Sequence, residues 1–458
     1  MRKRLAGLLA GMLVGIAPAH AEIDLVGAAR KALQHDPLYA AALAQDRADQ
    51  AKRRQGRAGY LPQIFATGNL RYGTVDQETT GAKFSGGGFG SSSGIAFDTR
   101  AAGATGAGWA VTIKENLYST EKRVDNQVMN IAADIGDASL RLARQTLLLR
   151  VAQAYFDTLL AEDTVNALRS TRDAALLARK MALARFETGD AAVTDSNDAQ
   201  AHADLAAAQW QAAQTDLVLK RAALSDLTGD ADTTLRPLRD STSLATLPSG
   251  DFADWQQRAM VENPLLELRT LGVRRAEEES KRHGRGSGIS VDAFASYLGD
   301  RINGAGYGSN SSMRSNSAVV GVMVTIPLYT GGLRSAQYDE SVALLDKAHL
   351  DEDAARITVA RDVREAYLGF QSAEAQVVAL TQAKHSARLQ LDANRTGFEA
   401  GDRPLIDVLN AQQVLFSTQR DLASARYQIA LNRLRLAAAA GELDEDHMAQ
   451  VNALLNSR

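Results

Sequence analysis

Apolar and polar residues alternate at every second position in four short segments of the chain, near 64–73, 107–117, 289–299 and 317–328. In the first segment Ile64 and Leu70 fall on one side of the alternation, and Asn69 and Arg71 fall on the other. A period of two predicts β-strands, each with one apolar face and one polar face.

Two much longer segments, 119–187 and 333–399, repeat apolar residues at helical spacing. Residues Leu140, Leu147 and Val151 in the first segment are an example. At about 1.5 Å per residue each segment would span roughly 100 Å, whereas an ordinary helix has about 11–12 residues. Such helices must pack against other helices as in a coiled coil.

The two long segments belong to an internal duplication. The stretch from Arg185 to Gln200 aligns with the stretch from Gly397 to Gln412, and seven positions are identical. These include Gly189/Gly401 and Asp195/Asp407. Self-similarity at a fixed offset indicates two copies of one structural unit.

The duplication divides the chain into two similar halves, 22–229 and 251–441, joined by a linker at 230–250 and followed by a tail at 442–458. Each half is predicted to begin with a polar helix, at 22–58 or 251–284, followed by two strands around a Gly/Ser-rich loop. A long helix, a Gly-Asp turn and a second helix at 191–228 or 403–440 complete each half.

The first 21 residues have the features of a secretory signal peptide. Three basic residues precede an apolar run from Leu5 to Ala17, and Ala19-His20-Ala21 supplies an A-x-A cleavage site. This pattern predicts export from the cytoplasm and a mature chain beginning near Glu22. A membrane anchor is the alternative, but a run of about 13 apolar residues is short for a membrane span.

The amino-acid composition excludes several classes of function. The absence of cysteine excludes disulfides, thiol catalysis and thiolate metal sites. A formal charge of −3 argues against a nucleic-acid binder. No H-E-x-x-H motif and no G-x-S-x-G nucleophile elbow between a strand and a helix is present, so we expect no metal, no cofactor and no enzymatic activity.

Four strands are too few to close a membrane barrel, because the smallest single-chain barrels have about eight. The remaining sequence is helical and offers no second sheet to cover the apolar face. A transmembrane barrel would therefore have to be assembled from several chains. Aromatic residues near the strand ends are predicted to anchor the membrane interfaces rather than to stack on a ligand, namely Tyr72, Trp109, Tyr118, Tyr297 and Tyr329.

Several motifs resemble the TolC family of outer-membrane efflux and secretion channels. They are Asp36-Pro37, Gly59 to Gln63, Thr325 to Gly332, and the paired Phe-x-x-Gly-Asp turns. The resemblance implies an α+β membrane protein that forms a homotrimer. Each protomer would give four strands to a 12-stranded transmembrane β-barrel and helices to a long periplasmic helical barrel.

The same resemblance implies a passive exit duct in the outer membrane that carries proteins or small toxic compounds. Its partners would be outer-membrane lipid, a periplasmic adaptor protein and an inner-membrane transporter, either ABC-type or proton-driven. The turns at Gly189-Asp190 and Gly401-Asp402 would face the adaptor.

The resemblance also suggests a periplasmic gate. Positions Asp407 and Asn410 match the family's constriction rings, and Asp195, Phe398 and Arg403 match contacts that hold the inner helices closed. Asn410 replaces a common acid and Phe398 replaces a common tyrosine, so we expect a neutral ring at Asn410 and a weaker latch, with Asp198 partly restoring the charge. The alternative is that these acids only stabilise helix N-termini.

Two other functions remain open from the sequence. A soluble periplasmic coiled-coil adaptor or scaffold would share the long helices but would not need four alternating strands. A periplasmic enzyme is supported by nothing beyond the length of the chain.

Overall fold

The computed structural model describes residues 22–86, 90–189, 192–230, 234–238, 250–284, 287–303 and 312–455. The predicted signal peptide, Asp190 and most of the predicted linker lie outside these residues.

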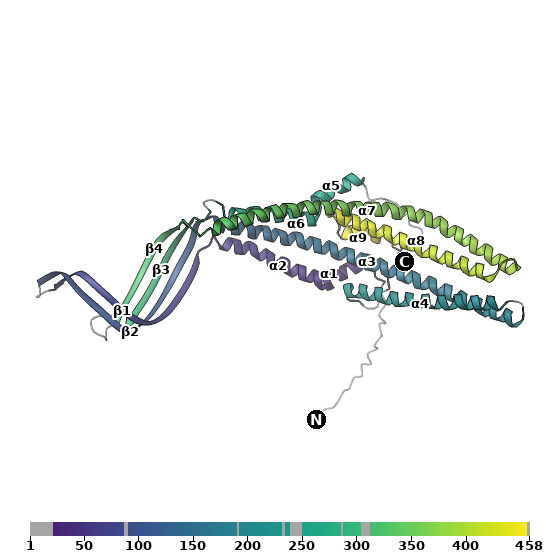
Figure 1. The fold of residues 1–458 in the computed structure, drawn as a ribbon, viewed down its shortest axis with the longest axis horizontal. Coiled ribbons are helices and arrows are strands. Elements are labelled where there is room, and N and C mark those ends of the chain that lie inside the picture. Colours follow the sequence, from purple (N-terminus) through teal and green to yellow (C-terminus); the bar gives the residue numbers. More distant parts are fainter. Residues whose placement is uncertain are drawn as a thin grey trace, which may run out of the picture. The chain divides into compact units, whose positions relative to one another are not determined.

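The described residues of the first half form four helices and two strands. They are α1 (Leu25–His35), α2 (Pro37–Ala58), β1 (Gln63–Gly86), β2 (Gly90–Ser119), α3 (Thr120–Glu187) and α4 (Val193–Thr228). The second half repeats this order with α5 (Phe252–Glu262), α6 (Pro264–Lys281), β3 (Ser290–Asn303), β4 (Ser312–Thr325), α7 (Leu333–Ala400) and α8 (Leu405–Ala440). A short helix, α9 (Glu445–Asn452), follows (Figure 1).

Corresponding helices in the two halves match in length. Helices α3 and α7 each have 68 residues, and α4 and α8 each have 36. Both shorter helices end at a left-handed glycine, Gly229 with φ 79° and Gly441 with φ 86°. Glycine is favoured there because a Cβ atom opposes this backbone conformation.

The polar helix predicted at the start of each half is divided into two in the structure. The break falls at Asp36 before Pro37 and at Asn263 before Pro264, with ψ angles of 119° and 120°. Proline excludes the helical conformation from the residue before it, so the backbone turns extended at both positions. The expectation of single helices over 22–58 and 251–284 was therefore wrong.

The chain forms two compact units, and α3 and α7 contribute residues to both. The first unit comprises the chain up to Asp46, Asp137–Arg269 and everything from Glu352 onward. Its largest core gathers side chains from α1, α3, α4, α8 and α9, including the fully buried Leu25, Tyr155, Leu431 and Met448. The Tyr155 hydroxyl lies 3.1 Å from the Ile23 carbonyl oxygen and 2.9 Å from that of Arg236. Burial raises the pKa of Tyr155 far above its ordinary value, so this hydroxyl stays a hydrogen-bond donor.

The second unit comprises Arg47–Gly136 and Thr270–Asp351. Its helical part is held by charged contacts at the ends of α2, α3 and α6. Arg53 pairs with Asp134 at 2.7 Å, and Arg282 pairs with Asp125 at 2.7 Å. Partial burial opposes the charge of Arg282, but its hydrogen bonds to Glu279 and Asp125 raise its pKa above the ordinary value.

The four strands of this unit form one antiparallel sheet in the order β1-β2-β3-β4 (Figure 1). The register places Ile64, Ile113, Ala295 and Val320 in one row across the sheet. The opposite face is more polar, and there Thr112 and Ser296 share a hydrogen bond of 2.9 Å. The alternation predicted from the sequence thus separates an apolar from a more polar face.

The strands extend much further than the sequence indicated. Strands β1 and β2 have 24 and 30 residues, and they include most of the Gly/Ser-rich segment 73–108 that was expected to be a loop. Backbone groups pair there from Gly73 with Ala104 up to Gly86 with Gly90, with register shifts on the way. Backbone hydrogen bonds need no apolar alternation, so the sequence pattern did not mark this part of the hairpin.

Among the residues that the structure describes, no helix is long and apolar enough to cross a membrane.

Candidate functional site

The turn between α7 and α8 is built around Gly401. This residue has φ 84°, and its N–H donates to the Phe398 carbonyl at 3.1 Å. The N–H groups of Asp402 and Arg403 both donate to the Gly397 carbonyl, at 2.9 and 3.2 Å. These bonds satisfy carbonyls at the end of α7 that have no partner within the helix. They also fix the position of Arg403.

Arg403 and Asp407 form an ion pair across the first turn of α8. The guanidinium Nη1 atom lies 3.3 Å from Asp407 Oδ2, and 59% of the Arg403 side chain is exposed against 33% for Asp407. The backbone carbonyl of Asp407 accepts a further bond from Asn394 on α7 at 3.2 Å. An acid in a first turn also interacts favourably with the helix dipole. Asp407 is therefore held by two neighbours, and Asn410 lies one turn further along, exposed to solvent.

In the turn between α3 and α4, the described residues repeat the glycine conformation of the other turn but show fewer side-chain contacts. Gly189 has φ 83°, and its N–H donates to the Phe186 carbonyl at 3.0 Å. Asp195 lies in the first turn of α4, where its N–H donates to the Ala192 carbonyl at 3.1 Å. Asp195 and Asp198 are both exposed, and within the described residues neither forms an ion pair.

A side-chain contact joins the two turns. The guanidinium carbon of Arg185, near the end of α3, lies 5.7 Å from the ring centroid of Phe398, near the end of α7. A cation at this distance from an aromatic face is attracted by the ring quadrupole. The equivalent ring in the first copy, Phe186, is 41% exposed.

The structure therefore brings together some of the predicted gate residues and separates others. Arg403 contacts Asp407, and Phe398 contacts Arg185, which the sequence reasoning missed. One feature of the sequence could have pointed to Arg185. It is the basic residue in the last turn of α3, where a positive charge interacts favourably with the helix dipole. Asp195 is not joined to Arg403 or Phe398 by any contact in the described part of the chain.

Comparison with known families identifies the chain. Its sequence matches the family described as "Outer membrane efflux protein" over residues 28–230 and 255–442. The chain belongs to this family. The two matched segments lie one in each half of the duplication.

Two relatives of this outer membrane efflux protein are similar over most of their length. Outer membrane protein TolC of Vibrio cholerae is 27% identical over 436 residues, which is 92% of this chain and 92% of the relative. Alkaline protease secretion protein AprF of Pseudomonas aeruginosa is 27% identical over 462 residues, covering 99% of this chain and 92% of the relative.

Solved structures share the fold of this efflux protein. The outer membrane protein VceC of Vibrio cholerae superposes with a TM-score of 0.71 at 17% identity, covering 91% of this chain and 96% of that one. Together, the family and the fold place the protein in the outer membrane as an exit duct for efflux or secretion. The soluble adaptor alternative finds no support in these relatives.

The predicted interface aromatics of the efflux protein lie mainly on the apolar face of the sheet. Trp109 and Tyr297 contact each other edge to face, with ring centroids 5.4 Å apart. The alternation and register place Tyr72 and Tyr118 on this face too, opposite Thr105 and Val291. Tyr329 follows the end of β4 rather than lying in it, and it is 89% exposed.

A metal site was not expected from the sequence. Within the described ranges, no three His, Cys, Asp or Glu side chains are grouped so that they could hold a metal ion.

Proposed function

We propose that three copies of this chain close one 12-stranded barrel in the outer membrane. The observation that carries the proposal is the open sheet, in which β1 and β4 each pair on one side only. Unpaired strand edges of 24 and 14 residues would expose backbone groups that lipid cannot satisfy. Pairing β4 of one copy with β1 of the next satisfies both edges, and the family resemblance favours three copies.

The apolar face of the sheet supports contact with lipid. Exposed fractions there reach 69% for Ile64, 87% for Leu70 and 84% for Val320. Aromatic residues bound this band on β2, with Tyr118 at one end and Trp109 nine residues away. Nine residues span about 30 Å along a strand. At a tilt of roughly 35–45° they give a height of about 21–25 Å, close to the apolar band of ~25 Å in outer-membrane barrels.

The helical end of the duct is proposed to carry its gate. In a trimer, three copies of Asp407 and three of Asn410, one helical turn further along, would form two rings around the tunnel. Asp407 is suited to this role because Arg403 and Asn394 fix its position. The Asn410 ring would be neutral.

The closed state is proposed to depend on the contact between Arg185 and Phe398. This contact ties the end of α3 to the end of α7, so the two helical hairpins cannot separate without losing it. The exposed position of Phe186 argues that the first copy of the motif makes no equivalent contact. The latch would therefore rest on Arg185 of the first hairpin and Phe398 of the second.

The turns would also receive the other members of a tripartite export system. Gly189 and the stretch from Gly401 to Arg403 are exposed, and they offer a docking surface for a periplasmic adaptor protein. An inner-membrane transporter, ABC-type or proton-driven, would supply the cargo. AprF is named as a protease secretion protein, which favours protein cargo over small molecules.

Cysteine cross-linking tests the trimeric barrel, because the natural chain contains no cysteine. Thr67→Cys in β1 is combined in turn with Met313→Cys, Ser315→Cys, Ser317→Cys or Val319→Cys in β4. A disulfide needs Cβ atoms about 3.5–4.5 Å apart, so one register should give covalent trimers in denaturing gels. The control is Thr112→Cys in β2 with the same partners, which should give monomers. Covalent ladders beyond three chains, or monomers in every register, would contradict the trimer.

A further inference from the structure

Two arginines lie opposite each other on the apolar face of the sheet. Arg301 of β3 is the direct cross-strand partner of Arg314 of β4. The same row continues with Ala107 and Leu70, and the next row contains Trp109. Directly opposed like charges destabilise a sheet unless something neutralises them.

Within the described part of the chain, no group neutralises this pair. Among the residues that the structure describes, no carboxylate forms an ion pair with Arg301 or Arg314. The nearest acid in sequence, Asp300, belongs to the opposite face, where it is bound by Arg71. Arg301 donates from Nε to Asn303 Oδ1 at 3.3 Å, which leaves its two terminal nitrogens for another acceptor.

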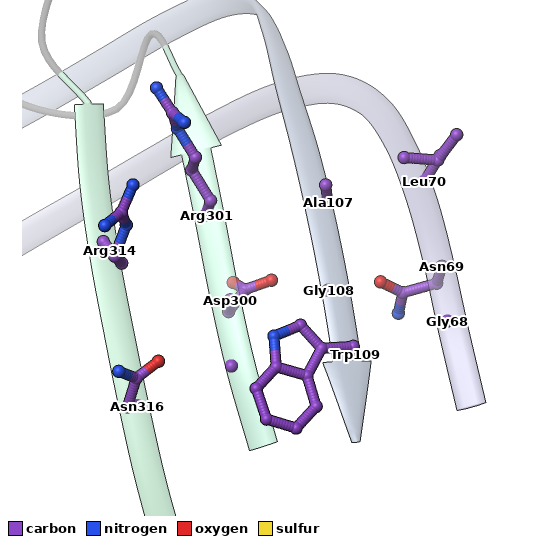
Figure 2. A pocket seen from close by; sticks show the side chains of 11 residues that line it. Gly68, Asn69, Leu70, Ala107, Gly108, Trp109, Asp300, Arg301, Arg314 and Asn316 are labelled. Atoms are coloured by element: carbon purple, nitrogen blue, oxygen red, sulfur yellow. The ribbon is translucent and has the colours of Figure 1, made fainter. Parts of the chain in front are cut away.

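The arginines form the rim of a hollow of about 440 Å³ on the sheet surface. Leu70, Ala107 and Trp109 line its apolar part, and Asn316 adds an amide beside Arg314. Figure 2 shows both arginines rising from adjacent strands in the same direction, with the Trp109 ring below them. The hollow thus combines an apolar floor with two cationic groups at one edge.

The position of the pair along the strands indicates which part of a membrane it would meet. Arg301 lies two residues beyond Gly299, the cross-strand partner of Trp109, on the side of the hairpin that joins β3 to β4. Two residues add about 7 Å along the strand. In the proposed barrel, both guanidinium groups lie in the aromatic belt between the rows of Trp109 and Tyr72, at headgroup level and on the side away from the helices.

We propose that Arg301 and Arg314 bind the phosphate of a phosphorylated lipid headgroup in the outer leaflet of the outer membrane. The proposal rests on the proposed barrel, because only there does this face meet lipid. A planar guanidinium matches a phosphate with two parallel hydrogen bonds. Two adjacent arginines therefore place several donors around one dianionic group, and the phosphate removes their mutual repulsion. The hollow beside Trp109 takes the apolar part of the same headgroup region.

The test compares lipid binding by the full-length trimer in nanodiscs. Wild type, Arg301→Gln/Arg314→Gln and the control Arg71→Gln are placed in zwitterionic lipid that contains lipid A, either with its phosphates or after enzymatic dephosphorylation. Bound lipid A is counted by native mass spectrometry after release from the disc. Loss of several charge-assisted hydrogen bonds should weaken binding of phosphorylated lipid A by about tenfold or more in the double variant. The control removes an arginine from the opposite face at the same level, so its binding should equal that of wild type.

Three results would overturn the proposal. They are equal binding of phosphorylated lipid A by wild type and the double variant, equal binding of phosphorylated and dephosphorylated lipid A by wild type, and full displacement of the lipid by inorganic phosphate. The last result would assign the site to free phosphate. Trimer formation and channel conductance of the double variant are measured alongside. Failure of the barrel itself would abolish these in wild type as well, and so it differs from failure of the lipid site.

Discussion

The two turns at the ends of the long helices are copies of one motif with different side-chain contacts. Their glycines have the same conformation, with φ 83° at Gly189 and φ 84° at Gly401, and an acid follows in the first turn of a 36-residue helix in both. In the second copy the acid is paired with Arg403 and the phenylalanine is covered by Arg185. In the first copy Asp195 and Phe186 are exposed.

This difference shows how a duplicated motif can take on two roles. The glycine conformation that the two copies share allows the chain to turn from one helix into the next, and both copies need this turn. The contacts that join one hairpin to the other require one partner from each copy, so the copies must differ. The first copy supplies the cation Arg185, and the second supplies the aromatic ring Phe398.

The largest expected effect comes from removing the ring. Phe398→Ala should raise the open probability of the channel in planar bilayers, because the contact between the hairpins is lost in all three chains. A cation–π contact at an exposed site is worth about 0.5–1 kcal/mol. Three such contacts opening together change the open-to-closed ratio by roughly tenfold or more. Phe186→Ala is the matched control and should leave conductance unchanged. Equal effects of the two variants would show that the turns do not differ as proposed.

A somewhat smaller effect is expected for the acids. Asp407→Ala should raise single-channel conductance and the concentration of multivalent cation that blocks the channel, because a ring of three carboxylates is lost. We expect about a tenfold rise in blocking concentration, equivalent to ~1.4 kcal/mol of lost cation binding. Asp195→Ala should change the blocking concentration by less than about twofold, since isolated exposed charges interact weakly in water.

Glu399→Ala serves as the control for charge at the same turn. Glu399 pairs with Arg395 at 3.3 Å in the same i,i+4 manner, but it lies on α7 rather than α8. A blocking concentration that rises as much for Glu399→Ala as for Asp407→Ala would remove Asp407 from the gate.

The smallest expected effect belongs to Arg403→Ser. The exposed ion pair with Asp407 contributes about 0.3–0.5 kcal/mol in each chain, so its loss in three chains should raise the open-to-closed ratio by roughly fivefold. Cation block should change in the opposite direction from Asp407→Ala, because the carboxylate ring loses its nearest positive charge. The blocking concentration therefore falls while conductance without blocker rises. A rise in both quantities would mean that Arg403 does not balance Asp407.

Much of this arrangement follows from the sequence, because long periodic patterns are strong signals. The sequence placed the long helices at 119–187 and 333–399, and the structure has them at Thr120–Glu187 and Leu333–Ala400. The i,i+4 spacing of Arg403 and Asp407 was also visible, since it depends only on helix geometry. Membership of the family came from short motifs at turns and strand ends.

Three features could not be read from the pattern. The outer part of the β1–β2 hairpin is held by backbone pairing that brings charged, apolar and small residues together without a regular alternation, as in Asp76 with Arg100 and Thr79 with Phe97. The contact of Arg185 with Phe398 joins residues more than two hundred positions apart, and it depends on how two helices lie side by side. The unpaired arginines of β3 and β4 likewise emerge only from the register between strands.

The equal lengths of corresponding helices have a consequence for the evolution and engineering of this chain. Each residue added to a helix moves its end by about 1.5 Å and rotates the following side chains by ~100°. An insertion in α3 alone would therefore carry Arg185 away from Phe398 after a single residue. Length changes should be tolerated only as matched pairs, in both copies at once and in steps of whole heptads. Equal helix lengths in the two copies therefore preserve the contact between the two turns.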